Sequence, residues 1–282
     1  MNFIISLKDF LEFDFLMYAL LGTVILSIIC GLISPLIIAR KNAFMGAAIS
    51  HSTLLGMSLA LAIFSAENPI SIFLFTLLIT IATSLFLARS TFRQMLPNDS
   101  LIGIFYTSTM ALGIIIHSLF SKSKTDLLSF LFGNILLLTK DDLLISIALL
   151  IIITPMILIP FAKWIYLTFD EEGAIVSGIK AKRYHYLFFI ILSLLIVTSV
   201  KLAGTILIET LLLIPGFFAL SFNMSVKKTF IISVLFSLVF SIFGLILANF
   251  FSLPSGATLA IVQFSALILF TSIKKLYNLF NQ

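Results

Sequence analysis

The chain has 282 residues, of which 61% are hydrophobic and 10% are charged, and its mean hydropathy is +1.22. Soluble globular proteins have about 45–50% apolar and about 25% charged residues. This composition excludes a soluble domain and predicts a membrane protein. The net charge of +5 does not indicate nucleic-acid binding, because the charges lie in short clusters between apolar runs. The lone cysteine, Cys30, excludes an internal disulfide and a cysteine-cluster metal site.

Apolar runs recur along the whole chain. A bilayer core of about 30 Å requires about 20 apolar residues in a helix. We expect eight or nine spans, the alternative arising at 184–222, where Lys201 and Gly204 barely divide two segments. The runs cover about 15–39, 43–64, 70–88, 100–120, 143–165, 184–200, 203–222, 229–250 and 257–273. The sequence therefore predicts an all-α, polytopic transmembrane helical bundle that forms a single domain over 1–282.

The lysines and arginines orient these spans. With the N-terminus outside, twelve of the 17 fall in the connections on one side of the membrane. The positive-inside rule assigns that side to the cytoplasm. We therefore expect the N-terminus outside, the C-terminus in the cytoplasm, and 169–183 as the longest cytoplasmic loop. Residues 121–142 then form an outer segment, in which the apolar piece 127–138 re-enters the membrane or lies at its surface.

The second span carries a histidine. His51 stands in MGAAISHSTLLG, at 45–56. Ionisable groups within spans are costly, so they are candidate functional residues. The imidazole could bind a metal or relay protons, or it could join two helices by a hydrogen bond. The small residues around it could pack helices together or leave room for a pathway. These small residues include Gly46, Ala47, Ser50 and Gly56.

The seventh span carries a carboxylate, Glu209, in ILIETLLLIPG. An unpaired carboxylate in hydrocarbon is costly, so we expect Glu209 to face the bundle interior or to pair with another group. Pro215 and Gly216 follow within two turns and predict a kink or a break in this span. Broken spans beside polar groups are where transporters place binding sites.

The loop FDEEGAIVSGIKAKR, at 169–183, predicts a short helix. Asp170, Glu171 and Glu172 could cap its N-terminus, and Gly178 could end it. Such a helix could dock a cytosolic partner, or the loop could be a solvated turn held by its own charges.

The sequence has no GxxxxGK[ST], HExxH or GxSxG motif. It therefore offers no P-loop for ATP and no familiar protease or hydrolase centre. An intramembrane enzyme that uses His51 and Glu209 as acid and base is an alternative, but no nucleophile accompanies them. A structural anchor would need neither side chain.

Five segments, in order, resemble the permease subunits of manganese/zinc/iron-type metal ABC transporters. They are RKNAFMGAAISHSTLLG, TDLLSFLFGNILLLTKDDLL, FDEEGAIVSGI, LAGTILIETLLLIPGFFA and LPSGATLAIV, and the resemblance runs from about residue 15 to 275. It implies the permease fold of type II importers, which serve metals and vitamins, and transport without catalysis. It also implies a homodimer in the bacterial cytoplasmic membrane, a cytosolic ABC ATPase subunit, an extracytoplasmic metal-binding protein and no resident cofactor.

The resemblance also assigns roles to residues. It makes His51 a metal ligand, and we expect a substrate pathway along the small residues around it and Pro215. It makes the 169–183 loop the element that couples to the ATPase. The coupling positions are Phe169, Asp170, Glu171, Ala174 and Gly178.

The chain departs from the family pattern at three positions. The family has an aspartate one helical turn before the histidine, where this chain has Ala47, and a proline where it has Leu55. Glu209 stands where the family has an apolar residue, so we expect it to supply the missing acid; alternatively, it pairs with Lys201 or a hydroxyl. An imidazole suits zinc and carboxylates suit manganese, so zinc is expected first and manganese or iron next. A metal chelate or another small substrate is the alternative.

Overall fold

The computed structural model describes residues 10, 12–64, 69–92, 98–120, 133 and 135–280, and within these ranges it contains helices and no strand. Eight of the described helices are long and apolar enough to cross a membrane. They are α2 (Asp14–Ala39), α3 (Ala43–Ile63), α4 (Pro69–Phe92), α5 (Asn98–Phe120), α7 (Lys140–Leu158), α10 (Ala181–Ala203), α12 (Val226–Phe251) and α13 (Ser255–Phe280). The shorter helices are the 3₁₀ helix η1 (Ile135–Leu137), α8 (Phe161–Phe169), α9 (Glu171–Val176) and α11 (Thr205–Leu220). The expected all-α class is confirmed, while most of the predicted outer segment, 121–132, lies outside the described residues.

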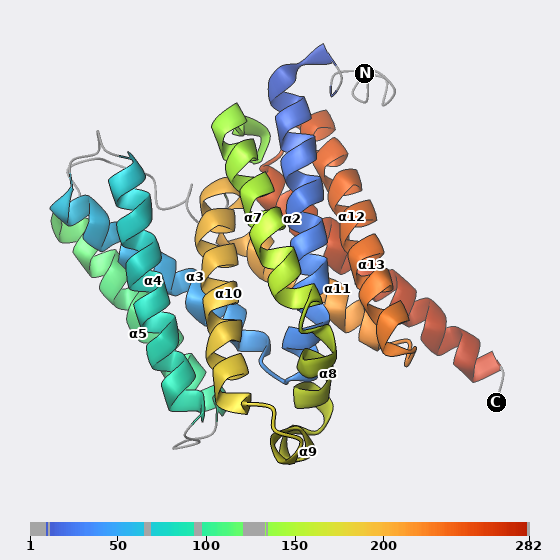
Figure 1. The fold of residues 1–282 in the computed structure, drawn as a ribbon. Helices are drawn as coiled ribbons and strands as arrows, with labels where there is room; N and C mark the ends of the chain where they lie inside the picture. Colours follow the sequence, from blue (N-terminus) through green and yellow to red (C-terminus); the bar gives the residue numbers. More distant parts are fainter. Residues whose placement is uncertain are drawn as a thin grey trace. The chain divides into compact units, whose positions relative to one another are not determined.

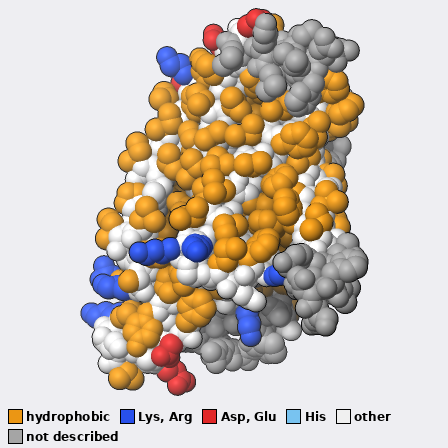
Figure 2. Space-filling model, turned by 90° about the vertical axis from the view of Figure 1, so that its right-hand side faces the viewer, with side chains coloured by type: hydrophobic (Ala, Val, Ile, Leu, Met, Phe, Trp, Pro, Cys, Tyr) orange, Lys and Arg blue, Asp and Glu red, His pale blue; other side chains and the backbone are white. Residues whose placement is uncertain are grey.

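Hydrophobic side chains cover much of the surface that is visible in Figure 2. Many large apolar side chains on the spans are exposed, among them Ile70, Leu78 and Ile151. Soluble monomers rarely expose such large apolar areas, whereas hydrocarbon tails solvate them. This surface is that of a protein embedded in a bilayer.

A single glycine separates α10 from α11. Gly204 has φ +79° and ψ 166°, a conformation that essentially only glycine adopts. The backbone of Gly133 approaches it so closely that a Cβ on Gly133 would overlap Ala203 and Gly204. Helix α11 has 16 residues and is therefore about 24 Å long, less than a full bilayer core. The described residues thus contain eight helices long enough to span the membrane. The shorter apolar helix α11 is the segment that made a ninth span an alternative in the sequence.

The predicted span over 143–165 is wrong at its C-terminal end. Helix α7 ends at Leu158, and α8 begins as a separate helix at Phe161. Pro160 stands between them; proline has no amide hydrogen and disfavours a helical conformation at the preceding residue. The residues after the proline are also apolar, so the sequence analysis extended the predicted span past the end of α7.

The chain divides into two compact units. Unit 1 comprises residues 1–38, 132–147 and 202–282, and unit 2 comprises residues 39–131 and 148–201. In unit 1, α11 packs against α12 and α13, which also pack against each other; in unit 2, α3 packs against α4 and α5 (Figure 1). The single domain expected from the sequence stays a prediction.

Helix α11 runs without a break through Pro215, so the break predicted there is not found. The amide of Gly216 donates a hydrogen bond to Oγ of Ser34 in α2, at 2.7 Å. In membranes, side-chain hydroxyls from neighbouring helices commonly bond backbone groups that a proline frees. Ser34 of α2 thus accepts a hydrogen bond from α11 at the position where the sequence predicted a kink or a break in this helix.

We expect Gly216→Ala to destabilise unit 1. A Cβ at this position would lie 2.5 Å from the carbonyl carbon and from Oγ of Ser34, so α2 and α11 would have to move apart. Overpacking of this kind costs about 1–3 kcal/mol. The melting temperature of the purified protein should fall, whereas Gly103→Ala, whose Cβ would meet nothing within 4 Å, should leave it unchanged. Equal melting temperatures for the two variants would contradict this account.

Candidate functional site

His51 lies inside unit 2, in the middle of α3. Its side chain is only 6% exposed. The imidazole meets the ring of Tyr106 in α5 edge to face, with the ring centroids 4.6 Å apart and the planes at 89°. Since α3 packs directly against α5, this contact orients the imidazole between two candidate spans. A side chain that can bind a metal or carry a proton is therefore held within unit 2.

Tyr106 is a residue that the sequence analysis missed. It stands in IFYTSTM, where hydroxyl side chains interrupt an apolar span. The hydroxyls of Thr107 and Thr109 donate to carbonyls of their own helix, as such side chains commonly do in spans. The tyrosine is the member of this group that contacts the histidine, and the polar interruption was the signal that could have identified it.

Close helix contacts explain part of the small-residue run around His51. A Cβ on Gly56 would lie 3.0 Å from the carbonyl oxygen of Thr76 in α4. A Cβ on Gly113 of α5 would lie 3.0 Å from the amide nitrogen of Leu55. Gly56 thus serves helix packing, which is the usual role of small residues in membrane helices. A role in a substrate pathway for Gly56 stays a prediction.

Gly46, Ala47 and Ser50 lie on α3 within two turns of His51. Ala47 is partly exposed and stands one turn before the histidine, on the same helix face. Ser50 is fully buried, and its Oγ has no hydrogen-bond partner among the described residues. A substrate pathway beside the imidazole, along this hydroxyl and the small side chains around it, stays a prediction.

Glu209 belongs to unit 1, near the start of α11 and partly exposed. Pro215, further along the same helix, is buried. Because His51 belongs to unit 2, a site shared by the imidazole and this carboxylate stays a prediction, as does a pair with Lys201. Among the described residues, no three His, Cys, Asp or Glu side chains form a group that could hold a metal ion.

The short helix predicted in the cytoplasmic loop is present as α9. Asp170 is its N-cap, and its Oδ1 accepts a hydrogen bond from the amide of Gly173 at 2.9 Å. At the other end, Gly178 adopts φ +83°, and the amide of Ile179 bonds the carbonyl of Ala174 at 3.0 Å. A glycine in this conformation with such a bond is a common helix terminator. The capping roles expected for Asp170 and Gly178 are confirmed.

One side of α9 is fixed and the other is exposed. Ala174 is fully buried in a small core with Leu167 of α8 and Ala181 of α10. A separate set of large apolar side chains in this loop points away from that core. This exposed apolar set is Phe169 (68% exposed), Ile175 (53%) and Val176 (89%). In a connection between spans, adjacent exposed apolar residues are typical of a protein contact surface. Sequence reasoning missed Ile175 and Val176, although two adjacent apolar residues in a charged loop were a usable signal.

Arg40 stands directly after α2, and the sequence analysis assigned it no role of its own. Its Nε donates to Oγ1 of Thr168 at 3.0 Å, and its guanidinium lies 5.4 Å from the ring centroid of Trp164 and 5.0 Å from that of Phe188. Burial lowers the pKa of Arg40 to about 10, and the negative charge of Glu171 opposes this shift. The guanidinium therefore stays charged at neutral pH and ties α8 to α10.

Comparison with known proteins places these features in a family. Residues 12–275 match the model of the ABC 3 transport family. The chain belongs to the ABC 3 transport family. This match covers nearly the whole chain, and it confirms the resemblance that the five sequence segments indicated.

Individual relatives and a solved structure agree with this assignment. The chain is 34% identical over 261 residues to a manganese import system permease protein, ScaB, of Streptococcus gordonii, covering 93% of this chain and 91% of that protein. It is 32% identical over 251 residues to a high-affinity zinc uptake system membrane protein, ZnuB, of Haemophilus influenzae, covering 88% and 94%. A solved structure of PsaBC from Streptococcus pneumoniae in complex with Fab superposes with a TM-score of 0.83 at 29% identity, covering 95% of each chain.

Two expectations follow directly from family membership. The chain is a membrane-embedded transport permease of the ABC class, as the sequence predicted. It is a transport protein and not an enzyme, so the pairing of His51 and Glu209 as an intramembrane acid and base is set aside.

Proposed function

We propose that this permease imports a divalent transition-metal ion as its substrate, driven by ATP hydrolysis on a separate subunit. The observation that carries the proposal is His51, a side chain of a type that binds metals, which is buried in α3 of an ABC 3 family chain. Relatives named for manganese import and zinc uptake support a metal as the substrate. The chain itself has no P-loop motif, which supports an ATPase on another polypeptide.

Transport on this proposal is alternating access, with the 169–183 loop as the coupling element. The exposed apolar set on the loop suits contact with an ATPase subunit. The buried side of α9 suits force transfer, because its core joins α8 and α10 and Arg40 ties the same two helices. The proposal places the N-terminus outside and the C-terminus in the cytoplasm, with a homodimer of this chain receiving its substrate from an extracytoplasmic metal-binding protein.

The choice of metal depends on the donors around His51. The imidazole without the aspartate one turn earlier favours zinc, since that position is Ala47. A carboxylate supplied by Glu209 would shift the preference toward manganese or iron. Relatives named for manganese and for zinc have similar sequence identity to this chain, so they do not distinguish the two metals. The choice of metal therefore rests on the donor atoms around His51.

Uptake of labelled Zn²⁺, Mn²⁺ and Fe²⁺ tests the proposed function. Cells that lack the gene should accumulate one of these ions more slowly than cells that carry it, and re-expression should restore uptake. The same measurement with excess unlabelled competitor ranks the three metals. Equal accumulation of all three ions with and without the gene would contradict the proposal.

Glu209→Gln is expected to lower uptake by about tenfold, because the amide removes a negative charge from the cation's donors. The matched control is Glu12→Gln, which makes the same chemical change at an exposed position before α2. Protein levels in the membrane should be equal for both variants. Unchanged uptake in Glu209→Gln at normal expression would show that this carboxylate does not replace the acid absent at Ala47.

A further inference from the structure

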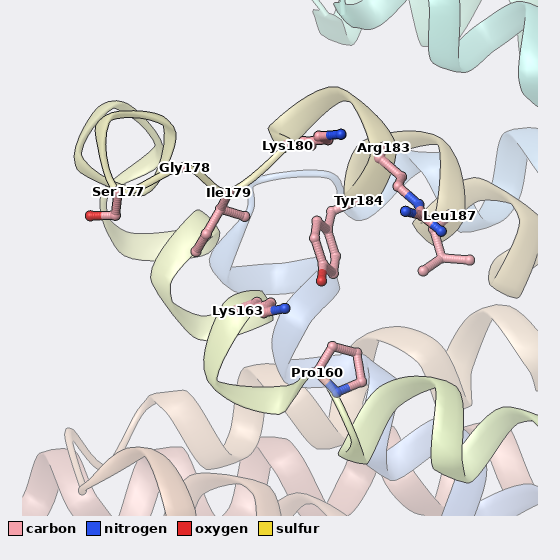
Figure 3. Close-up of a pocket in the computed structure, with 9 residues that line it drawn as sticks. All are labelled: Pro160, Lys163, Ser177, Gly178, Ile179, Lys180, Arg183, Tyr184 and Leu187. Carbon is pink, nitrogen blue, oxygen red and sulfur yellow. The ribbon is translucent and has the colours of Figure 1, made fainter.

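A basic pocket lies in unit 2, where Pro160 before α8, helix α8, the connection between α9 and α10, and the start of α10 line it (Figure 3). Its volume is about 520 Å³. Lys163 of α8, Lys180 of the connection before α10 and Arg183 of α10 contribute three cations to its lining. The described lining includes no carboxylate, although the acidic start of α9 is close by in the sequence. The pocket therefore collects positive charge from two helices and the connection before α10.

The pocket is held in shape by the packing beneath it. Tyr184, a lining residue, packs against the core formed by Leu167, Ala174 and Ala181. Its ring also meets Trp164 edge to face, with the centroids 5.2 Å apart. Figure 3 shows the Tyr184 side chain projecting between Lys163 and Leu187, and Nζ of Lys163 lies 6.0 Å from the Tyr184 ring centroid. Three cations that line one pocket favour binding of an anion.

The pocket also has apolar residues in its lining. Pro160, Ile179 and Leu187 line it together with the cations. Just before Pro160, at the end of a candidate span, Leu158 is 49% exposed and Ile159 is 84% exposed. The other wall belongs to the first turns of α10, a second candidate span. Cations thus lie where two spans end, next to exposed apolar side chains.

We propose that this pocket binds the phosphate-bearing headgroup of an anionic phospholipid. The cations suit the phosphate, and the exposed apolar residues at the end of α7 suit the first methylenes of the acyl chains. Basic pockets at the ends of membrane helices commonly hold such headgroups. A free phosphate would use the cations but not the apolar residues. An acidic protein segment is the other chemistry that the charges would admit, and the test below separates it.

Native mass spectrometry of the purified full-length permease, titrated with phosphatidylglycerol or phosphatidylcholine, tests the proposal. The wild type should retain phosphatidylglycerol more tightly than phosphatidylcholine. In the double variant Lys163→Gln/Arg183→Gln, the affinity for phosphatidylglycerol should fall by about tenfold or more, since each basic residue near anionic lipid contributes about one kilocalorie per mole. The matched control is Lys182→Gln, an exposed cation next to Arg183 that does not line the pocket.

The outcomes decide the assignment without any transport measurement, so failure of this proposal is distinct from failure of the proposed function. Equal phosphatidylglycerol affinity in the double variant and the wild type would overturn it. So would displacement of the lipid by inorganic phosphate at similar concentration, which would indicate a phosphate site. Loss of a co-purifying ATPase subunit with unchanged lipid binding would assign the pocket to a protein partner. If the double variant does not fold, Lys180→Gln, an exposed side chain on the pocket lining, gives the same comparison.

Discussion

Cells that carry His51→Ala are expected to take up the transported metal at about a tenth of the wild-type rate or less. Removing even a residue that only supports a metal ligand costs about 10–100-fold in metal affinity, and loss of the ligand itself should cost at least as much. The imidazole is buried in α3 and oriented by the Tyr106 ring, so no solvent-exposed group can readily replace it. Initial rates of labelled-ion uptake in cells with matched expression provide the measurement.

Two further variants separate ligation from packing at His51. His51→Phe keeps an aromatic ring that can meet Tyr106 edge to face but cannot bind a cation. If the histidine only packs α3 against α5, this variant should transport normally; if it is a ligand, uptake should be lost while the melting temperature is kept. His117→Ala, in the last turn of α5, is the matched control for removal of a histidine from the same unit. Normal uptake in His51→Phe would rule out the ligand role.

Arg40→Ala is expected to destabilise unit 2 by about 2–4 kcal/mol and to lower transport more than this loss of stability explains. The variant removes a charge-assisted hydrogen bond to Thr168 and cation–π contacts to Trp164 and Phe188. Such a hydrogen bond contributes about 1.5–3 kcal/mol, and a partly desolvated cation–π contact contributes about 1–2 kcal/mol. These contacts position α8, and with it the loop that we propose couples to the ATPase.

Thermal unfolding and metal-stimulated ATP hydrolysis of the reconstituted transporter measure the two effects of Arg40→Ala. Arg40→Lys should recover only part of either, because an ammonium cannot lie flat on a ring or donate from a planar fork. Since the pKa of Arg40 is about 10, its charge persists from pH 6 to pH 8, and the defect should be constant over that range. Lys41→Gln, the exposed neighbour, is the matched control. An Arg40→Ala protein with wild-type stability and coupling would contradict this role.

Most helices could be located from the sequence, because the length of an apolar run determines a span and a few residue types determine where it ends. Gly204 divides α10 from α11 where the sequence suggested a narrow separation, and Asp170 and Gly178 begin and end α9 as expected. These features depend on backbone conformations and caps that a short segment determines by itself.

Contacts between distant segments were beyond the same reasoning. The Ser34 hydroxyl bonds the Gly216 amide across 182 positions of chain, so the effect of Pro215 could not be judged from α11 alone. Arg40 contacts Thr168 across 128 positions, and Tyr106 reaches the histidine from another helix. The sequence also does not reveal which polar side chain of one span contacts a candidate metal ligand on another span.

Substitutions on the two sides of the α9 segment have different structural consequences. Substitutions at Ala174 alter the packing of the segment on α8 and α10, so this position has little freedom to change. Phe169 at the end of α8 and Ile175 and Val176 of α9 are exposed, and among the described residues they are not part of the small core that holds the segment in place. They can therefore change in step with a partner surface while the permease keeps its fold. On the proposed coupling role, a new ATPase subunit would require changes at these exposed residues only, and the packing of α9 on α8 and α10 would stay as it is.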